Sequence, residues 1–426
     1  MANRETHSIT DQDFSSQTPL LSKHPSEAAS VTPDPIRQFL SIPDSYLIIF
    51  KQGTKQETVL SHHDEIEEIQ RIEKFLTSRD LDFGIIHKYE IGNFSGYSGK
   101  FSSSVIRIIQ TYEEVDYVEQ DKYIEAASIQ NRAPWGLARI SHREVLNSVT
   151  FDKYMYEKNG GKYVTVYVLD TGIYDKHNDF DGRASFGVNL LNCSSEEDTN
   201  GHGTHSAGII GGKVYGVAKR AKLVSVKILD EDGIGTLSNA IAGINWVFKN
   251  HAFGVRRSLS RKWIYKGAVA TLNFITTKST ALNQAVNEGA YKGISIVVPA
   301  GNNMGNACNY SPSSAKNCIT VSASTYYDHD TRPSNFGECV DIYAPGQNIL
   351  SAWNTDMNSK KVLSGTSTAA SHVAGLAAYY TSMVEGQSTP EYIKRKIIYT
   401  STPDIIRVDL VGRSYFEPLA FYETNT

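Results

Sequence analysis

The sequence predicts an α/β fold, in which a mostly parallel sheet is covered by helices on both faces and a small α+β domain precedes it. The first observation is that apolar, β-rich runs recur from about residue 160 onward. These runs are apolar throughout instead of alternating with polar residues, which is typical of parallel strands that are buried on both faces. The second observation is that helical stretches lie between several of the runs, and this alternation indicates a parallel sheet.

The composition is that of an ordinary globular protein. Of the 426 residues, 40% are hydrophobic and 21% are charged, and the net charge is −4. Because the chain has no basic excess, we do not expect it to bind nucleic acid. No apolar run approaches the roughly 18 residues of a membrane span. The polar N-terminus lacks the apolar run of a secretory signal.

The N-terminal part divides into two predicted segments. Residues 1–43 are rich in Ser, Thr, Pro and charge and show no periodicity, so we expect a disordered or leader segment there. A compact α+β unit is expected to follow it. Its predicted strands and amphipathic helices cover residues 45–51, 63–76, 102–112 and 115–121.

The elements of the larger domain follow from the apolar runs. The predicted strands are 163–170, 223–230, 267–274, 295–301 and 318–324, and the predicted helices include 238–250 and 282–293. In folds of this kind, functional sites form at the carboxyl ends of the strands. Polar motifs follow the apolar runs, so we look for the site there.

Three polar motifs contain the candidate catalytic residues. Asp170 ends the strand of "VTVYVLDTGI", His202 lies in "NGHGTHSAG", and Ser367 lies in "SGTSTAASHVAG" before a helical run of small residues. Taken alone, Asp170 reads as a turn residue and Ser367 as a helix N-cap. His202 and His205 are three residues apart with no Glu between them, so a zinc-protease motif is not favoured.

Taken together, the three motifs indicate nucleophilic catalysis. A serine hydroxyl is a weak nucleophile until a base takes its proton. A helix N-terminus offers backbone N–H groups to a developing oxyanion. The order Asp, His, Ser is that of subtilisin. A non-proteolytic α/β enzyme that shares only a strand-end Asp is excluded, because three motifs agree in order and context.

The same three motifs resemble the signature blocks of subtilisin-like serine proteases. The stretches "APWGLARISHR" and "YGVAKRAKLVSVKILDEDGIGT" extend the similarity to the fungal proteinase K and cerevisin branch, over roughly residues 46–415. The resemblance implies an inhibitor propeptide over residues 46–127 and a peptidase domain over residues 128–426. It also implies self-cleavage near Glu125 to Ser128.

The resemblance implies a role for each motif residue. Ser367 would be the nucleophile, His202 its general base and acid, and Asp170 the group that orients the imidazole. Asn302 matches the oxyanion-hole asparagine of the family. The expected partners are protein or peptide substrates and the chain's own propeptide, and we expect a monomer.

The substrate-binding residues are also carried over from the family. The loop "GIGTL" keeps the substrate-pairing segment, and two further segments would line the P1 pocket, which takes the substrate side chain before the cleaved bond. The candidates are Gly233, Ile234, Gly235, Asn273, Phe274, Ile275, Ala300 and Gly301.

Several positions depart from the family pattern. Residues Ile275–Thr277 replace glycines that line the P1 pocket with β-branched residues, which predicts a narrowed pocket and small P1 residues. Ser371 replaces a proline, and Ser206 stands where the branch has a free cysteine. The leading hypothesis is a self-inhibited serine endopeptidase. The alternative is a catalytically weakened relative that binds peptides or a partner.

Ions and location are further expectations from the resemblance. No cofactor is expected, but Asp341 matches a calcium-binding aspartate that would act with the carbonyl groups of Lys316 and Cys318. The four cysteines do not reproduce the disulfides of proteinase K, which leaves their pairing open. A secreted, vacuolar or cell-wall location is implied, with a dedicated processing task such as spore-wall formation.

Overall fold

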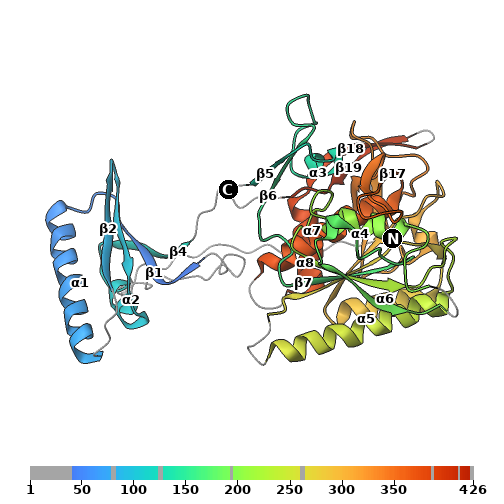
Figure 1. Cartoon of the computed structure of the whole chain (residues 1–426). Helices are drawn as coiled ribbons and strands as arrows, with labels where there is room; N and C mark the ends of the chain where they lie inside the picture. The colour runs from blue at the N-terminus through green and yellow to red at the C-terminus, as the bar shows by residue number, and fades with distance from the viewer. Residues whose placement is uncertain are drawn as a thin grey trace, which may run out of the picture. The chain divides into compact units, whose positions relative to one another are not determined.

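The computed structural model describes residues 41–77, 83–122, 128–191, 195–259, 264–384, 388–410 and 413–422 (Figure 1). These residues form two compact units, 41–122 and 128–422. Most of the predicted leader lies outside the described residues, and only its last three residues fall in a strand. The bond predicted to be cleaved also falls largely outside them. No helix among the described residues is long and apolar enough to span a membrane.

The first unit is a four-stranded antiparallel sheet with two helices. Its strand order is β2-β3-β1-β4. The elements are β1 (Ser41–Phe50), α1 (Gln56–Thr77), β2 (Gly84–Ile91), β3 (Phe94–Lys100), α2 (Ser103–Ile109) and β4 (Val115–Lys122). Apolar side chains from both helices and from three strands form its core. Ser102 caps α2 by accepting the N–H of Val105.

The second unit is built on a nine-stranded sheet, which confirms the predicted α/β class. The strand order is β18-β19-β15-β14-β12-β10-β7-β9-β8, and all pairs are parallel except β18 with β19. The strands are β7 (Val164–Asp170), β8 (Ala184–Asn189), β9 (Lys222–Lys227), β10 (Gly267–Leu272), β12 (Ile294–Pro299), β14 (Ile319–Ser324), β15 (Ile342–Pro345), β18 (Thr402–Leu410) and β19 (Arg413–Leu419).

Helices cover both faces of this sheet. On one face lie α4 (His202–Gly211), α7 (Thr366–Met383) and α8 (Pro390–Thr400), and on the other lie α5 (Leu237–Ser258) and α6 (Thr280–Tyr291). Each face of the sheet packs against its helices in a hydrophobic core. The side chains of β7 alternate between these two cores: Val166 and Val168 lie on the side of α7, whereas Tyr167 and Leu169 lie on the side of α5 and α6. A strand that is buried on both faces must be apolar throughout, as the sequence predicted.

The remaining elements of the second unit are short. They are β5 (Ser128–Asn131), α3 (Trp135–Ile140), β6 (Lys153–Tyr156), β11 (Thr276–Thr277), β13 (Tyr310–Ser311), β16 (Ile349–Ala352) and β17 (Lys360–Leu363), with two 3₁₀-helices, η2 (Asn178–Phe180) and η3 (Ala307–Asn309).

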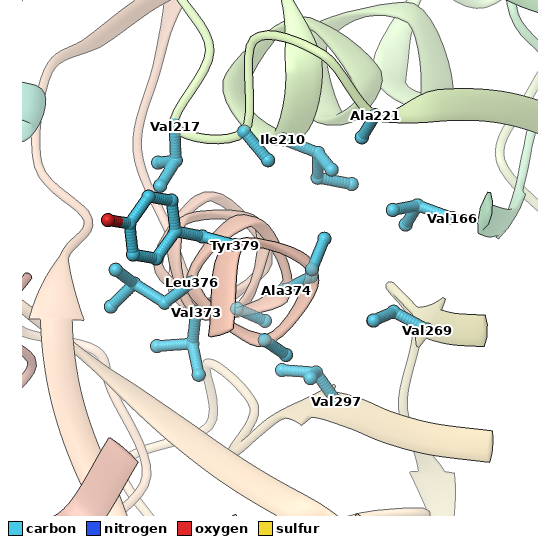
Figure 2. Packing of buried hydrophobic residues seen from close by; sticks show 14 of the residues in the cluster. Val166, Ile210, Val217, Ala221, Val269, Val297, Val373, Ala374, Leu376 and Tyr379 are labelled. Atoms are coloured by element: carbon cyan, nitrogen blue, oxygen red, sulfur yellow. The ribbon is translucent and has the colours of Figure 1, made fainter. Parts of the chain in front are cut away.

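The helix α7 runs through the core, and almost all of its residues are buried. Figure 2 shows Val166, Val269 and Val297 from three neighbouring strands on one side of this helix, with Ile210 and Val217 on another. A helix of Ala, Gly and Ser allows such close packing. A methyl group added at Gly375 would lie 2.6 Å from Cβ of Val217. The packing fixes the position of the N-terminal end of α7, which carries Ser367.

Candidate active site

Asp170 is the last residue of β7 and is fully buried. A buried carboxylate needs hydrogen-bond donors. Its Oδ1 accepts the N–H of Thr171 at 2.7 Å, and its Oδ2 accepts the hydroxyl of Ser206 at 3.2 Å. The strand end therefore holds the carboxylate in one orientation. Ser206 was noted in the sequence as a replacement for cysteine, but its bond to Asp170 could not be predicted.

His202 is the first residue of α4 and faces this carboxylate. Its Nδ1 lies 2.8 and 2.9 Å from the two carboxylate oxygens of Asp170. Because the carboxylate binds Nδ1 as an N–H donor, Nε2 is the nitrogen that can accept a proton. The imidazole comes this close because Gly203 follows it: a Cβ there would lie 2.1 Å from the carbonyl oxygen of Gly172.

The surroundings of His202 change its pKa. Burial lowers the pKa, but the charge of Asp170, its hydrogen bond and the more distant charge of Asp198 outweigh this effect. The net result is a raised pKa. The imidazolium form is therefore stabilised, which is what a general base requires after it takes a proton.

Asp198 holds the N-terminal end of α4. Its side chain accepts the N–H groups of Gly201 at 2.8 Å and Thr204 at 2.9 Å, and the hydroxyl of Thr171 at 2.8 Å. The sequence analysis missed this residue. An Asp four residues before the start of a Gly-rich helix is a capping signal that could have indicated it.

Ser367 is the second residue of α7, where backbone N–H groups lack partners within the helix. The N–H of Thr366 is bound by Oδ1 of Asn302 at 3.0 Å, and that of Thr368 by the carbonyl of Gly365 at 3.2 Å. The N–H of Ser367 has no acceptor among the described residues. It is therefore free to bind an oxyanion.

The exposed Asn302 brings a second donor to the same place. Its Oδ1 accepts the N–H of Thr366, and its amide NH₂ has no hydrogen-bond partner among the described residues. That nitrogen lies 3.1 Å from where a Cβ at Gly365 would stand, and Gly365 has φ 145°. A side chain at position 365 would crowd the amide. Two N–H donors thus lie near the start of α7.

The three residues predicted as a triad come from β7 and from the starts of α4 and α7. These two helices pack against each other on one face of the sheet (Figure 1). Asp170 and His202 are hydrogen-bonded, whereas no hydrogen bond joins His202 to Ser367 among the described residues. Such a bond is often absent until substrate binds.

Ser371 is fully buried and leaves α7 continuous. Its hydroxyl donates to the carbonyl of Ser367 at 2.8 Å and accepts from Nδ2 of Asn273 at 3.3 Å. Oδ1 of Asn273 accepts the hydroxyl of Thr271 at 2.7 Å. The side chain of Asn273 therefore bonds inward and links the end of β10 to α7.

The expected pocket residues lie on two adjacent segments. A Cβ built at Gly301, which has φ 106°, would lie 2.6 Å from Cδ1 of Ile275. The side chain of Ile275 therefore packs over this glycine. Phe274 is half-buried and Ala300 is fully buried. The segment that follows Ile275 pairs as β11 with β13.

The predicted loop of Gly233, Ile234 and Gly235 is exposed. The N–H of Ile234 donates to the side chain of Asp230 at 2.9 Å, which closes a tight turn. Nδ2 of Asn200 donates to the carbonyl of Glu231 at 2.8 Å. Asn200 precedes His202 by two residues, so the loop adjoins the histidine motif.

His205 is a structural residue. Its Nε2 donates to the carbonyl groups of Ile349 at 3.0 Å and Lys361 at 3.1 Å, and burial lowers its pKa to about 4. The described residues contain no group of three or more His, Cys, Asp or Glu side chains that could hold a metal ion.

The carboxylate of Asp341, where calcium was expected, is bound by a lysine side chain. The Nζ of Lys394 lies 2.8 and 2.9 Å from the two carboxylate oxygens of Asp341, and it donates to the carbonyl of Cys318 at 2.8 Å. An ammonium group therefore occupies the position between oxygens that were expected to bind calcium. These residues do not fit a metal ion.

One disulfide joins Cys308 to Cys339, with 5.3 Å between the Cα atoms. The sequence had left the pairing open. The disulfide connects the segment that follows Asn302 to the loop before β15. Cys318 is free and buried.

The chain is similar to known proteins over most of its length. The subtilase family model matches residues 161–415, and the model of peptidase inhibitor I9 matches residues 45–127. Alkaline protease 2 of Aspergillus fumigatus is 40% identical over 384 residues, which cover 85% of this chain and 78% of that protein.

Two further relatives extend the comparison. Cerevisin of Saccharomyces cerevisiae is 40% identical over 89% of this chain and 63% of its own length. The crystal structure of a cold adapted subtilisin-like serine proteinase matches with a TM-score of 0.61 and 35% identity, covering 69% of this chain and all of that one.

Proposed function

The chain belongs to the subtilase family and is a subtilisin-like serine endopeptidase, and on this premise we propose that Ser367 is its nucleophile, with His202 and Asp170 as partners. The observation that carries the proposal is the pair formed by Asp170 and Nδ1 of His202, which leaves Nε2 as a base. The unbonded N–H of Ser367 supports the same assignment.

The reaction follows from these groups. Nε2 of His202 takes the proton of the Ser367 hydroxyl as Oγ attacks the carbonyl carbon of the peptide. The oxyanion that forms is bound by the N–H of Ser367 and the amide of Asn302. His202 then gives its proton to the leaving amine, and an acyl-enzyme results. A water molecule then attacks the acyl-enzyme, with His202 again acting first as base and then as acid, and the carboxylic acid product leaves Ser367.

We propose that residues 46–127 act as the inhibitor segment of a zymogen whose peptidase domain covers residues 128–426. The match of peptidase inhibitor I9 to residues 45–127 supports this division. The compact core of the first unit supports it as well, because a segment with its own core can act as an independent inhibitor domain.

We propose a narrow P1 pocket that takes small side chains. The contact between Ile275 and Gly301 supports this, because the surface that glycine leaves open is covered by an isoleucine methyl group. A narrow pocket suits a dedicated processing task, of which spore-wall formation is one example. The Cys308–Cys339 disulfide supports an oxidising compartment, secreted or vacuolar.

A fluorophosphonate probe tests the proposed nucleophile. After removal of the first unit by an added protease, the parent chain should be labelled once, at Ser367, and should cleave peptides. The Ser367→Ala variant should take no label and lose activity by about 10⁶-fold. Labelling of the variant to the parent's extent would contradict the assignment. A parent that binds peptides but takes no label would favour the weakened relative.

A further inference from the structure

We propose that the ammonium group of Lys394 is a built-in cation that replaces a structural calcium ion at Asp341. This inference concerns the stability of the second unit and does not depend on the catalytic roles proposed above. It rests on the contacts of one lysine on α8 with two segments of the sheet.

The three donors of the ammonium group match the three oxygens around it. Nζ of Lys394 lies 2.8 Å from Oδ1 and 2.9 Å from Oδ2 of Asp341, and 2.8 Å from the carbonyl oxygen of Cys318. A lysine ammonium carries three N–H donors and no acceptor. Each of these donors has a protein oxygen as its partner here, so the hydrogen-bonding capacity of the ammonium group is fully used.

The site joins three elements of the second unit. Cys318 directly precedes β14, and Asp341 directly precedes β15. Oδ2 of Asp341 also accepts the N–H of Thr320 at 2.8 Å, which fixes the carboxylate against β14. Lys394 lies on α8, so its cation attaches the helix to the starts of two strands.

The packing of α8 fixes the position of Lys394 relative to the sheet. Ile393 and Ile397 are fully buried in the core on either side of Lys394 in the sequence. The N-terminus of α8 is fixed by Thr389, whose hydroxyl accepts the N–H of Tyr392. Because the backbone is fixed, the long side chain pays a reduced entropic cost for binding the oxygens.

A calcium ion would have to compete with this arrangement. Calcium takes six to eight oxygen ligands at about 2.3–2.6 Å. Here the carboxylate and one carbonyl group already bind the ammonium. A divalent cation at Asp341 is therefore disfavoured by the positive charge of Lys394, which lies within hydrogen-bond distance of both carboxylate oxygens.

A tethered cation behaves differently from a bound ion. It is covalently part of the chain, so a chelator cannot remove it and its occupancy does not depend on the calcium concentration. The side chains of Lys394 and Asp341 are 25% and 22% exposed, so solvent screens their attraction in part. We therefore expect a moderate effect on stability.

Thermal unfolding of the full chain tests the proposal. All variants carry Ser367→Ala, which prevents self-digestion, and each is melted in excess EDTA and in millimolar calcium. Lys394→Met keeps the apolar stem and removes the cation, and we expect its midpoint to fall by about 3–6 °C in EDTA. The matched control is Arg395→Met on the same helix, whose ion pair with Glu391 is exposed, with an expected fall of about 1 °C or less.

The calcium response decides the question. Asp341→Asn removes the carboxylate charge, and we expect it to respond to calcium as the parent does, since no calcium binds at Asp341 in either. This comparison stands even where Lys394→Met does not fold. The proposal is overturned where calcium raises the midpoint of the parent and Asp341→Asn abolishes that rise. It is also overturned where Lys394→Met is no less stable than Arg395→Met.

Discussion

The hydroxyl of Ser206 is one of the donors that hold Asp170, and we expect it to modulate how strongly that carboxylate raises the pKa of His202. Removing the donor leaves more negative charge available to the imidazolium. Ser206 is thus a positioning residue, and its effect should be visible in the pH dependence of the reaction.

We expect the kcat/KM of the activated enzyme to fall as the pH drops through the pKa of His202, which lies above its ordinary value of about 6.5. The sign follows because only neutral His202 can accept the Ser367 proton. In Ser206→Ala the midpoint should move to higher pH, and kcat/KM at neutral pH should fall about 5-fold. A pH–rate profile with a peptide substrate measures both.

Ser225→Ala is the control for this experiment. Ser225 is also a buried serine, and its hydroxyl has no hydrogen-bond partner among the described residues. Its profile should match that of the parent. A Ser206→Ala profile with an unchanged midpoint would show that the bond to Asp170 does not influence His202.

Ile275 is expected to restrict the P1 pocket because its methyl group covers Gly301. Ile275→Gly should raise the ratio of kcat/KM for Phe over Ala at P1 by at least about 10-fold. Paired peptide substrates that differ only at P1 measure the ratio. Lys278→Ala, three residues along at an exposed position, should leave it unchanged. If the ratio is unchanged in Ile275→Gly, Ile275 is not the residue that restricts the size of the P1 pocket.

At the scale of elements, the apolar runs predicted β7, β9, β10, β12 and β14 of the larger sheet, but not β8, β15, β18 and β19. The apolar runs at 163–170 and 267–274 became β7 and β10, and the helix predicted at 63–76 lies within α1. The hairpin of β2 and β3 was missed, because "IIHKYEIGNFSGYSGK" has no clear alternation and is largely exposed along β2. The short strand pairs β11–β13 and β16–β17 were also missed, because strands of two to four residues are too short to show a hydrophobic periodicity.

The helix α1 carries a buried histidine that should make the first unit sensitive to acid. His63 is 4% exposed, packs against the rings of Phe50 and Tyr97, and has no hydrogen-bond partner for either ring nitrogen among the described residues. Burial, together with the charges of Lys88 and His62, lowers its pKa to about 4. Asp64 and Glu67 oppose this shift in part.

The direction of the pH effect follows from this lowered pKa. In the unfolded chain His63 binds a proton near pH 6.5, whereas in the folded unit it does so only near pH 4. The stability of the first unit is therefore fully present above about pH 6.5 and decreases as the pH falls toward 4. The loss is on the order of 2–3 kcal/mol. Amide hydrogen exchange in α1 of the full Ser367→Ala chain, corrected for intrinsic rates, measures it.

His63→Phe should remove most of this loss, because phenylalanine fills the site and cannot be protonated. His87→Phe is the control, since His87 is exposed. Equal acid sensitivity in the parent and in His63→Phe would assign the effect to other groups, such as His62 with its Glu114 partner.

At the scale of the whole molecule, the sequence was sufficient for the family and the fold class but not for long-range side-chain contacts. Three short motifs in order identified Asp170, His202 and Ser367 as candidates. Lys394 and Asp341 are 53 residues apart, and nothing in either segment indicates that they meet. The Cys308–Cys339 pair was undetermined for the same reason. Such contacts depend on how α8 and the loops pack against the sheet.

The two units also define what the whole chain is expected to do. A self-inhibited protease must cut the connection between its inhibitor segment and its peptidase domain. That step needs the complete site and no added substrate, so it tests all proposed roles together.

The most direct measurement is the intact mass of the purified full chain beside its Ser367→Ala variant. We predict that the parent loses the segment that ends near Glu125 to Ser128, while the variant keeps its full mass. A parent and variant that both keep the full mass, or both lose the segment, would contradict self-cleavage by Ser367.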